Sequence, residues 1–248
     1  MKKLTLLAAL AVTSVPLAHA DTVLGVYAGF GSWDSTYDGK AGEPSITLKD
    51  LGVKGHKNSY YYIALEHPIP LLPNIRLAHT GINSKQTAEV NNAFTIDGTT
   101  FTDTDTIASE FDLTHTDATL YYELLDNWVN LDLGLTARQF DGFVYAQATN
   151  TPSKSKKVKV DQVLPMLYGK AQFDLPFSGL SIGIEGNYVG YQGDKISDYS
   201  AKMSYLFDSV LDVGVEAGYR TFSLSVDDDD LQTKIDLKGP YLAAIAHF

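Results

Sequence analysis

The feature that most constrains this chain is the alternation of apolar and polar side chains with a period of two residues. In the segment LSIGIEGNYVGYQ, from Leu180 to Gln192, one face carries Leu180, Ile182, Ile184, Gly186 and Tyr188, and the other carries Ser181, Gly183, Glu185 and Asn187. This period predicts a β-strand with one apolar and one polar face. Similar alternation recurs near residues 61–65, 117–123, 130–135, 201–207 and 212–220, and again in the last residues before Phe248. The chain is therefore expected to be all-β.

Two environments fit such strands. In a soluble sheet, or in a soluble periplasmic barrel that binds an apolar ligand inside, the apolar face packs against the interior. In a membrane barrel the apolar face touches lipid and the polar face lines an enclosed interior. No run of about 18 apolar residues follows residue 20, so a transmembrane helix is not expected. Hydrophobic residues nevertheless make up 44% of the chain, with 15 Tyr and 11 Phe. Because closure satisfies every backbone N–H and C=O group, alternating strands can cross a bilayer as a barrel, and this is the reading we favour.

The first twenty residues have the pattern of a secretory signal. Lys2 and Lys3 give a basic start, Leu4 to Val12 is a short apolar run, and Ala18-His19-Ala20 is a small-x-small cleavage site. We therefore expect a signal peptide at 1–20 and an outer-membrane β-barrel at 21–248.

The composition excludes several kinds of site. The chain has no Cys, which excludes disulfides and metal sites built on thiolates. Its net charge of −11 argues against nucleic acid as a partner, and no cofactor or metal is expected.

Turn signals divide the chain into about ten strands. We predict them near 22–31, 57–67, 75–95, 99–124, 128–147, 158–173, 180–192, 196–207, 210–226 and 231–248. The intervening segments are of two kinds, tight turns and longer polar loops such as 32–56, and the two kinds roughly alternate. Short periplasmic turns and longer extracellular loops are typical of outer-membrane barrels, which have an even number of strands. Eight strands is the alternative, because the regions 32–56 and 85–107 are difficult to place in register. Asp97-Gly98, between apolar residues, indicates a hairpin.

The stretch EHPIPLLPNIRL, from Glu66 to Leu77, follows a Tyr-rich strand. Together with the segments VLGVYAGFGSW and YYYIALEHPIPLLPNIRLAHT, it makes the chain resemble a small, largely uncharacterised proteobacterial family of outer-membrane β-barrels. The resemblance implies the fold and the Gram-negative outer membrane, and it supplies neither a substrate nor a catalytic set. The implied partners are outer-membrane lipid, lipopolysaccharide and the barrel-assembly machinery, which reads a C-terminal aromatic such as Phe248.

Two charged loop segments allow two interpretations each. The first contains four lysines that could contact lipopolysaccharide phosphates or keep a loop in water: Lys154, Lys156, Lys157 and Lys159. The acidic run Asp227 to Asp230 is read as a solvated loop tip, with divalent-cation binding as the alternative.

Reading the alternation strictly places a set of charged residues on the inward faces. These are Glu66, Arg76, Asp117, Glu123, Asp132, Arg138, Lys170, Glu185, Lys202, Asp212, Glu216 and Arg220. Facing lipid near the membrane centre, each Arg or Lys would cost about 2–4 kcal/mol, whereas inside a barrel the two signs can pair. We interpret the set as an ionic filling of a narrow barrel, with the lining of a solute path as the alternative.

The function predicted from these features is that of a non-enzymatic outer-membrane barrel, structural or at most a narrow passage for small solutes. The alternative is an enzyme at the outer rim, an omptin-like protease or a lipid-A-modifying enzyme. It would use His115 and Asp117, which lie two residues apart on one inward face, because a His–Asp pair can orient a general base. Among the aromatic residues, Trp33 is expected near the outer rim and Trp128 near the inner rim.

Overall fold

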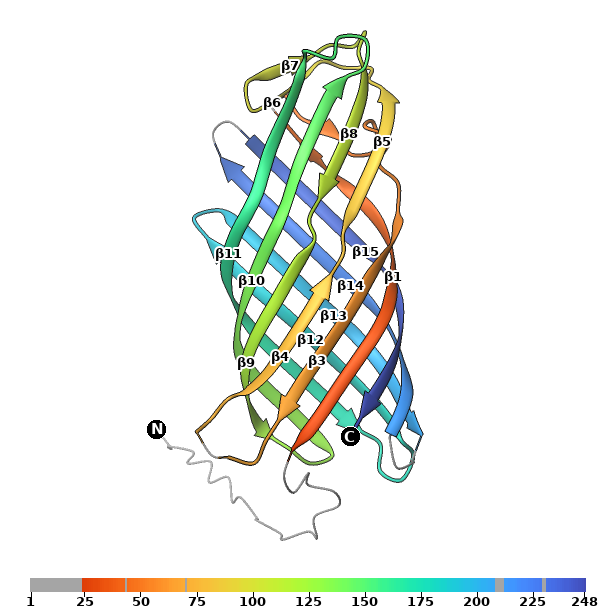
Figure 1. Cartoon of the computed structure of the whole chain (residues 1–248), viewed down its shortest axis with the longest axis vertical. Coiled ribbons are helices and arrows are strands. Elements are labelled where there is room, and N and C mark those ends of the chain that lie inside the picture. Colours follow the sequence, from red (N-terminus) through yellow and green to blue (C-terminus); the bar gives the residue numbers. More distant parts are fainter. Residues whose placement is uncertain (1–23, 43, 70, 208–211, 229–230) are drawn as a thin grey trace, which may run out of the picture.

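The computed structural model describes residues 24–42, 44–69, 71–207, 212–228 and 231–248, with the backbone alone for residues 227, 228, 231 and 232. The predicted signal peptide and the side chains of Asp227 to Asp230 lie outside what it describes. The described chain forms a closed antiparallel barrel of ten strands (Figure 1). The barrel strands are β1 (Gly25–Ala41), β3 (His56–Glu66), β4 (Asn74–Thr80) continued by β5 (Asn83–Glu89), β8 (Thr106–Asp112) continued by β9 (His115–Leu125), β10 (Val129–Ala148), β11 (Ser155–Asp174), β12 (Leu180–Tyr191), β13 (Asp194–Phe207), β14 (Asp212–Asp228) and β15 (Leu231–His247). The predicted all-β barrel of ten strands is confirmed, and the alternative of eight strands is wrong.

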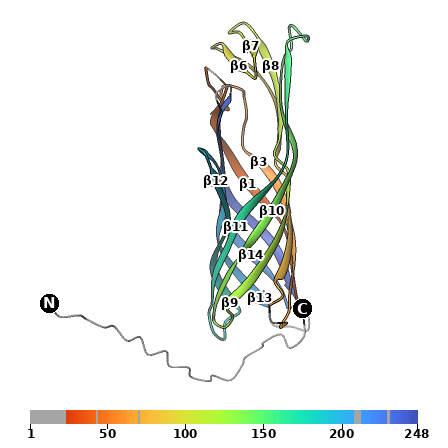
Figure 2. The same ribbon diagram turned by 90° about the vertical axis from the view of Figure 1, so that its left-hand side faces the viewer.

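The barrel closes because β1 pairs with the last strand as well as with the next one. β1 is hydrogen-bonded to β15, with Tyr27 opposite His247, and to β3, with Gly25 opposite Glu66. The turns 67–73, 126–128 and 175–179 lie at the end where β1 begins and β15 ends. The longer connections 42–55 and 90–105 lie at the other end, which we call the outer end because extracellular loops are the longer ones. Figure 2 shows that β8, β10 and the upper part of β11 extend beyond the rest of the barrel at this end.

The structure differs from the sequence prediction where strands leave the membrane. The predicted loop at 32–56 begins ten residues too early, since β1 continues to Ala41. Its upper part keeps alternating, with Trp33, Ser35 and Tyr37 buried, but the outward residues are polar because they face water there. The predicted strands 75–95 and 99–124 are also too long. Each is broken, and residues at their adjoining ends form β6 (Phe94–Ile96) and β7 (Thr99–Phe101), a separate hairpin at the outer end.

The β6–β7 hairpin turns at Asp97-Gly98, as predicted. Asp97 has φ 41° and Gly98 has φ 76°, and two positive φ values are what a tight hairpin turn with the strand's own twist requires. A short strand, β2 (Ile46–Thr47), pairs with the upper end of β1.

The apolar faces of the strands point outward. Leu135 on β10, Leu167 on β11 and Ile184 on β12 are 62%, 64% and 61% exposed, and Leu242 on β15 is 62% exposed. The alternate residues face the interior, where Arg138, Tyr168, Glu216 and Ala243 are buried. A soluble barrel would require the opposite arrangement, so the soluble alternative is wrong. The exterior is that of a membrane-spanning barrel. None of the described residues forms a helix long and apolar enough to cross a membrane.

Trp33 is inside the barrel, and the prediction that placed it at the outer rim is wrong. Its side chain is fully buried, its indole N–H donates a hydrogen bond to the carbonyl oxygen of Gly239 at 3.1 Å, and the guanidinium of Arg220 lies 5.0 Å from its ring. The reason is the register of β1, which turns odd-numbered residues inward at this height. Trp128, by contrast, is 59% exposed beside the turn at 126–128.

Candidate functional site

A cluster of four buried charged residues crosses the interior of the barrel. Arg138 on β10 donates hydrogen bonds to both oxygens of Asp117 on β9, at 2.7 and 2.6 Å, and a third to Asp198 on β13 at 2.8 Å. Arg220 on β14 donates two hydrogen bonds to Asp198, at 2.8 and 2.7 Å. We call Asp117, Arg138, Asp198 and Arg220 the charged cluster. Its charges balance, and it ties β9 and β10 to β13 and β14 across the lumen.

A second group of ion pairs lies beside the charged cluster. Glu185 on β12 pairs with Arg76 on β4 at 3.1 Å and with Lys202 on β13 at 2.8 Å. Lys202 also lies 3.2 Å from Glu216 on β14, which accepts a hydrogen bond from the hydroxyl of Tyr241 at 2.8 Å. These five side chains connect the wall formed by β4 with the wall formed by β12 to β15.

The remaining predicted interior residues lie toward the periplasmic end. Lys170 pairs with Asp132 at 3.0 Å. Glu66 accepts a hydrogen bond from the hydroxyl of Tyr121 at 2.6 Å, and Glu123 accepts one from the amide of Asn74 at 3.1 Å. Asp212 is partly buried near the start of β14. The structure thus places all twelve predicted charged residues at buried or partly buried positions.

Asp198 is the central residue that the sequence analysis did not select. It is 4% exposed and receives hydrogen bonds from both arginines of the charged cluster. Strict alternation along β13 would have found it, because it shares the inward face with Ser200 and Lys202. Asp198 lies near the start of the strand predicted at 196–207, and the alternation was followed only from Ser200 onward.

His115 and Asp117 do not form a His–Asp pair. The Nδ1 of His115 lies 2.9 Å from the carbonyl oxygen of Leu113, which fixes the proton on Nδ1 in the neutral ring. Its Nε2 has no hydrogen-bond partner among the described residues, and its nearest carboxylate is Asp198 at 3.9 Å. Asp117 is occupied by Arg138. The His115 ring is 2% exposed and packs against Phe140 and Phe222, with ring centroids 5.3 and 5.8 Å away.

Phe140, Phe222 and His115 form a layer that separates the charged cluster from a cavity above it. On the charged side, the space among the side chains amounts to about 40 Å³, room for only a few water molecules. On the outer side lies a cavity of about 410 Å³, which we call the outer chamber. A volume of this size falls in the range of small-molecule sites, about 300–1,000 Å³.

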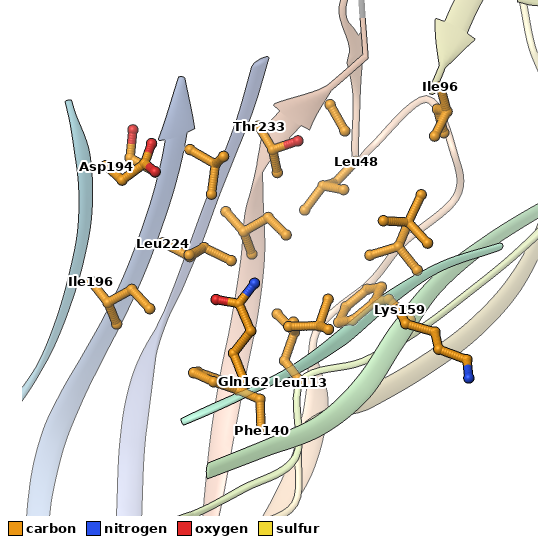
Figure 3. Close-up of a pocket in the computed structure, with 18 of the residues that line it drawn as sticks. Leu48, Ile96, Leu113, Phe140, Lys159, Gln162, Asp194, Ile196, Leu224 and Thr233 are labelled. Atoms are coloured by element: carbon orange, nitrogen blue, oxygen red, sulfur yellow. The ribbon is translucent and has the colours of Figure 1, made fainter. Parts of the chain in front are cut away.

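The wall of the outer chamber is mainly aliphatic and comes from distant parts of the chain. Figure 3 shows Leu48, Ile96, Leu113, Ile196 and Leu224 around the cavity, with Phe140 at one end. The amide of Gln162 on β11 points into the middle of this group and makes no hydrogen bond to another described residue. An apolar cavity with few polar groups favours an apolar molecule or the apolar part of an amphiphile. No pattern in the sequence predicted this chamber.

The fold and the exterior define the class of the protein: it is a membrane-spanning antiparallel β-barrel of the outer-membrane type. No family model matches the sequence, and no curated protein matches it. Among solved structures, the chain is similar in outline to three outer-membrane barrels. The outer-membrane protease OmpT from Escherichia coli has 11% identity and a TM-score of 0.44, with 95% of this chain and 99% of that chain covered. A FadL homologue of Pseudomonas aeruginosa has 10% identity and a TM-score of 0.38, with 91% and 90% covered. The toluene transporter TodX of P. putida has 9% identity and a TM-score of 0.30, with 92% and 90% covered.

Proposed function

We propose that this protein is a non-enzymatic outer-membrane barrel that is closed to ions and hydrophilic solutes and holds a small, mainly apolar molecule in the outer chamber. The observation that carries the proposal is the chamber itself, about 410 Å³ of mostly aliphatic wall above a sealed polar layer. A barrel with a purely structural role has no need of such a volume, because an empty apolar cavity destabilises the fold by the packing contacts that it lacks.

Closure of the barrel follows from the charged cluster and the layer above it. Arg138 and Phe222 are fully buried, Phe140 and His115 are 2% exposed, and together they fill the lumen between the outer chamber and the periplasmic end. A hydrated ion crossing this level would have to displace paired charges that are held by five hydrogen bonds. We therefore propose that solute passage from the chamber through the lumen does not occur.

The geometry does not favour the rim-enzyme alternative. A general base must be within hydrogen-bond reach of the proton that it abstracts, yet His115 is 2% exposed and packed against Phe140 and Phe222. Replacing His115 with Ala is expected to leave peptidase and lipid-A-modifying activities at the background level of the unchanged protein. A specific activity that the replacement abolishes would contradict the proposal.

The binding proposal is tested with the detergent-solubilised protein and N-phenyl-1-naphthylamine, an apolar probe that fluoresces more strongly in a dry site. Val160 lines the outer chamber, whereas Val163 on the same strand points outward and is 62% exposed. We expect saturable fluorescence above that of empty micelles, and an affinity at least tenfold weaker in Val160→Trp. Val163→Trp is the matched control and should bind like the unchanged protein. Equal binding by both variants would contradict the proposal.

The proposed surroundings are outer-membrane lipid and lipopolysaccharide, with insertion by the barrel-assembly machinery. Phe248 is 57% exposed after β15, where the machinery could read it during assembly. Replacing Phe248 with Ser is expected to lower the amount of heat-modifiable barrel in outer-membrane fractions severalfold, and an unchanged amount would contradict this role.

We also propose that the chain is a member of the uncharacterised proteobacterial barrel family, and the segments VLGVYAGFGSW and YYYIALEHPIPLLPNIRLAHT support this. An alignment of that family without both segments would contradict it.

A further inference from the structure

One junction in the barrel wall is paired along only part of its length. β11 and β12 are hydrogen-bonded from Asp174 opposite Ser181 up to Leu167 opposite Tyr188. Beyond this level, residues 155–166 of β11 pair with β10 alone, and β12 turns into β13 after Tyr191. We call this junction above Leu167 and Tyr188 the seam. Figure 2 shows β11 and the upper end of β12 diverging there.

The sequence at the seam fits an open edge. Pro165 lies two residues beyond the last β11–β12 pair and has no backbone N–H to donate. Within sheets, proline is confined to edges, strand starts and bulges for this reason. The outer chamber opens at the same place, since its wall includes Val160 and Leu164 on one side of the seam and Val189 and Tyr191 on the other.

The outward residues of β11 locate the seam relative to the membrane. Lys157, Lys159 and Asp161 are exposed on the upper part of the strand, and Val163 and Leu167 below them are 62% and 64% exposed. The change from charged to apolar marks the outer boundary of the apolar band. Val163 and Leu167 bracket the lower end of the seam, so the seam begins inside the apolar band and opens upward into the headgroup region. Backbone groups without partners are tolerated at this depth only where they line a cavity or reach water.

Charged groups in the chamber wall are concentrated around the seam. Asp194 and Lys195, at the start of β13, line the chamber beside the opening. Lys159 on β11 contributes to the rim of the chamber, with its ammonium group pointing away from the cavity (Figure 3). Lys159 and Lys195 form no ion pair with another described residue. The remaining charged lining residue, Glu110 on β8, pairs with Lys85 at 3.2 Å. The chamber is thus apolar at depth and charged at its lateral mouth, which matches a molecule with an apolar tail and a polar head.

We propose that the outer chamber takes a single-chain amphiphile from the outer leaflet through the seam, with the chain inside the chamber and the head between the strands at the mouth. This inference rests on the proposed function, because it names the substrate class and the entry route of the same chamber. The proposal is supported by one arrangement: the apolar band, the unpaired strand edges and the apolar chamber adjoin one another. No route through the charged cluster is needed.

The test closes the seam with an engineered disulfide bond, which we call the staple, in a chain that has no cysteine of its own. Continuing the register of the last pair would bring Leu164 opposite Tyr191. Oxidation of the variant Leu164→Cys/Tyr191→Cys therefore captures the moments at which the two edges approach each other, and it closes the seam. Tritiated lauric acid is added in liposomes either before or after oxidation, and the label that stays with the repurified protein is counted. We expect laurate to be trapped when it is added first and to be excluded at least tenfold when the staple is formed first. Reduction should restore loading, and the two single-cysteine variants are the controls.

The possible outcomes distinguish the entry route through the seam from binding in the outer chamber. Equal loading before and after a staple that mass spectrometry shows to be complete would overturn the seam as the entrance, while leaving chamber binding in place. If the reduced protein and the single-cysteine controls bind no laurate, and the unchanged protein binds neither laurate nor N-phenyl-1-naphthylamine, the chamber is not a binding site and both proposals fail.

A second measurement does not depend on forming the staple. A fluorophore is attached, in liposomes, to Val189→Cys at the seam or to Val144→Cys on β10, which lies on the other side of β11 from β12. Lipids brominated on their acyl chains should quench the label at 189 at least threefold more than the label at 144. Quenching of the label at 189 by aqueous iodide alone would overturn the lateral entrance.

Discussion

Arg138 and Asp117 face each other directly in the register of β9 and β10 and form a bidentate ion pair, with N–O distances of 2.7 and 2.6 Å. Both side chains are buried, at 0% and 5% exposure. The same guanidinium continues to Asp198, and through it to Arg220, so one cross-strand pair becomes a link across the whole lumen. Planar guanidinium geometry makes this possible, because a single group donates to two carboxylates at once.

Replacing Arg138 with Met is expected to lower the free energy of unfolding by about 3–5 kcal/mol, because it leaves Asp117 buried without its partner. Urea unfolding in lipid vesicles, followed by Trp fluorescence, measures the change. The control is Lys85→Met, which removes an exposed ion pair with Glu110 and should cost about 0–1 kcal/mol. The double variant Arg138→Met/Asp117→Leu should recover part of the loss, since no unpaired Asp117 remains. A loss in Arg138→Met no larger than that in the control would contradict the assigned role of the pair.

The closed lumen predicts no steady ion conductance in planar bilayers. Arg138→Ala/Arg220→Ala removes both cations of the charged cluster and is expected to produce small, cation-selective channels, because Asp117 and Asp198 would then line the opening. Single-channel recording measures this, and retained heat modifiability shows that the variant is folded. Open channels in the unchanged protein would disprove the closure.

A charged residue on the lipid-facing side is expected to destabilise the barrel. Leu135→Arg places a guanidinium in the middle of the apolar band, where Leu135 is 62% exposed, and should cost about 2–4 kcal/mol in vesicles. Lys159→Arg, outside the apolar band on β11, is the control and should leave the unfolding free energy within about 0.5 kcal/mol of the unchanged value. An equal effect of both substitutions would argue against the assigned membrane level.

The outer loops contain an ion pair with a testable pH dependence. Lys154 donates a hydrogen bond to Asp105 at 2.5 Å and the backbone N–H of Thr102 donates another at 2.8 Å, and these contacts lower the pKa of the Asp105 carboxyl to about 2. A lowered folded-state pKa adds stability that is fully present above the usual Asp value and is lost as pH falls toward 2. The amide proton resonance of Thr102 is therefore expected to titrate with a midpoint near pH 2.

Asp105→Asn supplies the control for this titration, because the amide cannot lose or gain a proton in that range. Its Thr102 resonance should show no midpoint between pH 1.5 and 5. A midpoint near pH 4 in the unchanged protein would show that Lys154 does not hold the carboxylate in solution.

Much of the fold follows from local sequence. The alternation around Ile182 and Glu185 determines which face of β12 meets lipid, because side chains on a strand alternate strictly and a one-residue slip would expose every charge. The turn at Asp97-Gly98 follows from the positive φ angles that its residues tolerate. The same alternation brought Arg138 and Asp117 to the interior, although it could not show which charges meet. The alternation was not recognised around Trp33. Above the membrane the outward-facing neighbours of Trp33 are polar, so that segment of the sequence resembles a loop.

Only the tertiary structure determined the charged cluster, the outer chamber and the seam. Asp198 lies 60 residues from Arg138 in the chain, and the two meet because barrel closure and strand tilt bring β10 and β13 to the same height. The chamber exists because strands of unequal length end at different levels, which depends on the register of every pair around the ring. Local alternation specifies the side of a strand on which a residue lies, whereas the height at which it meets its partners depends on how all ten strands close.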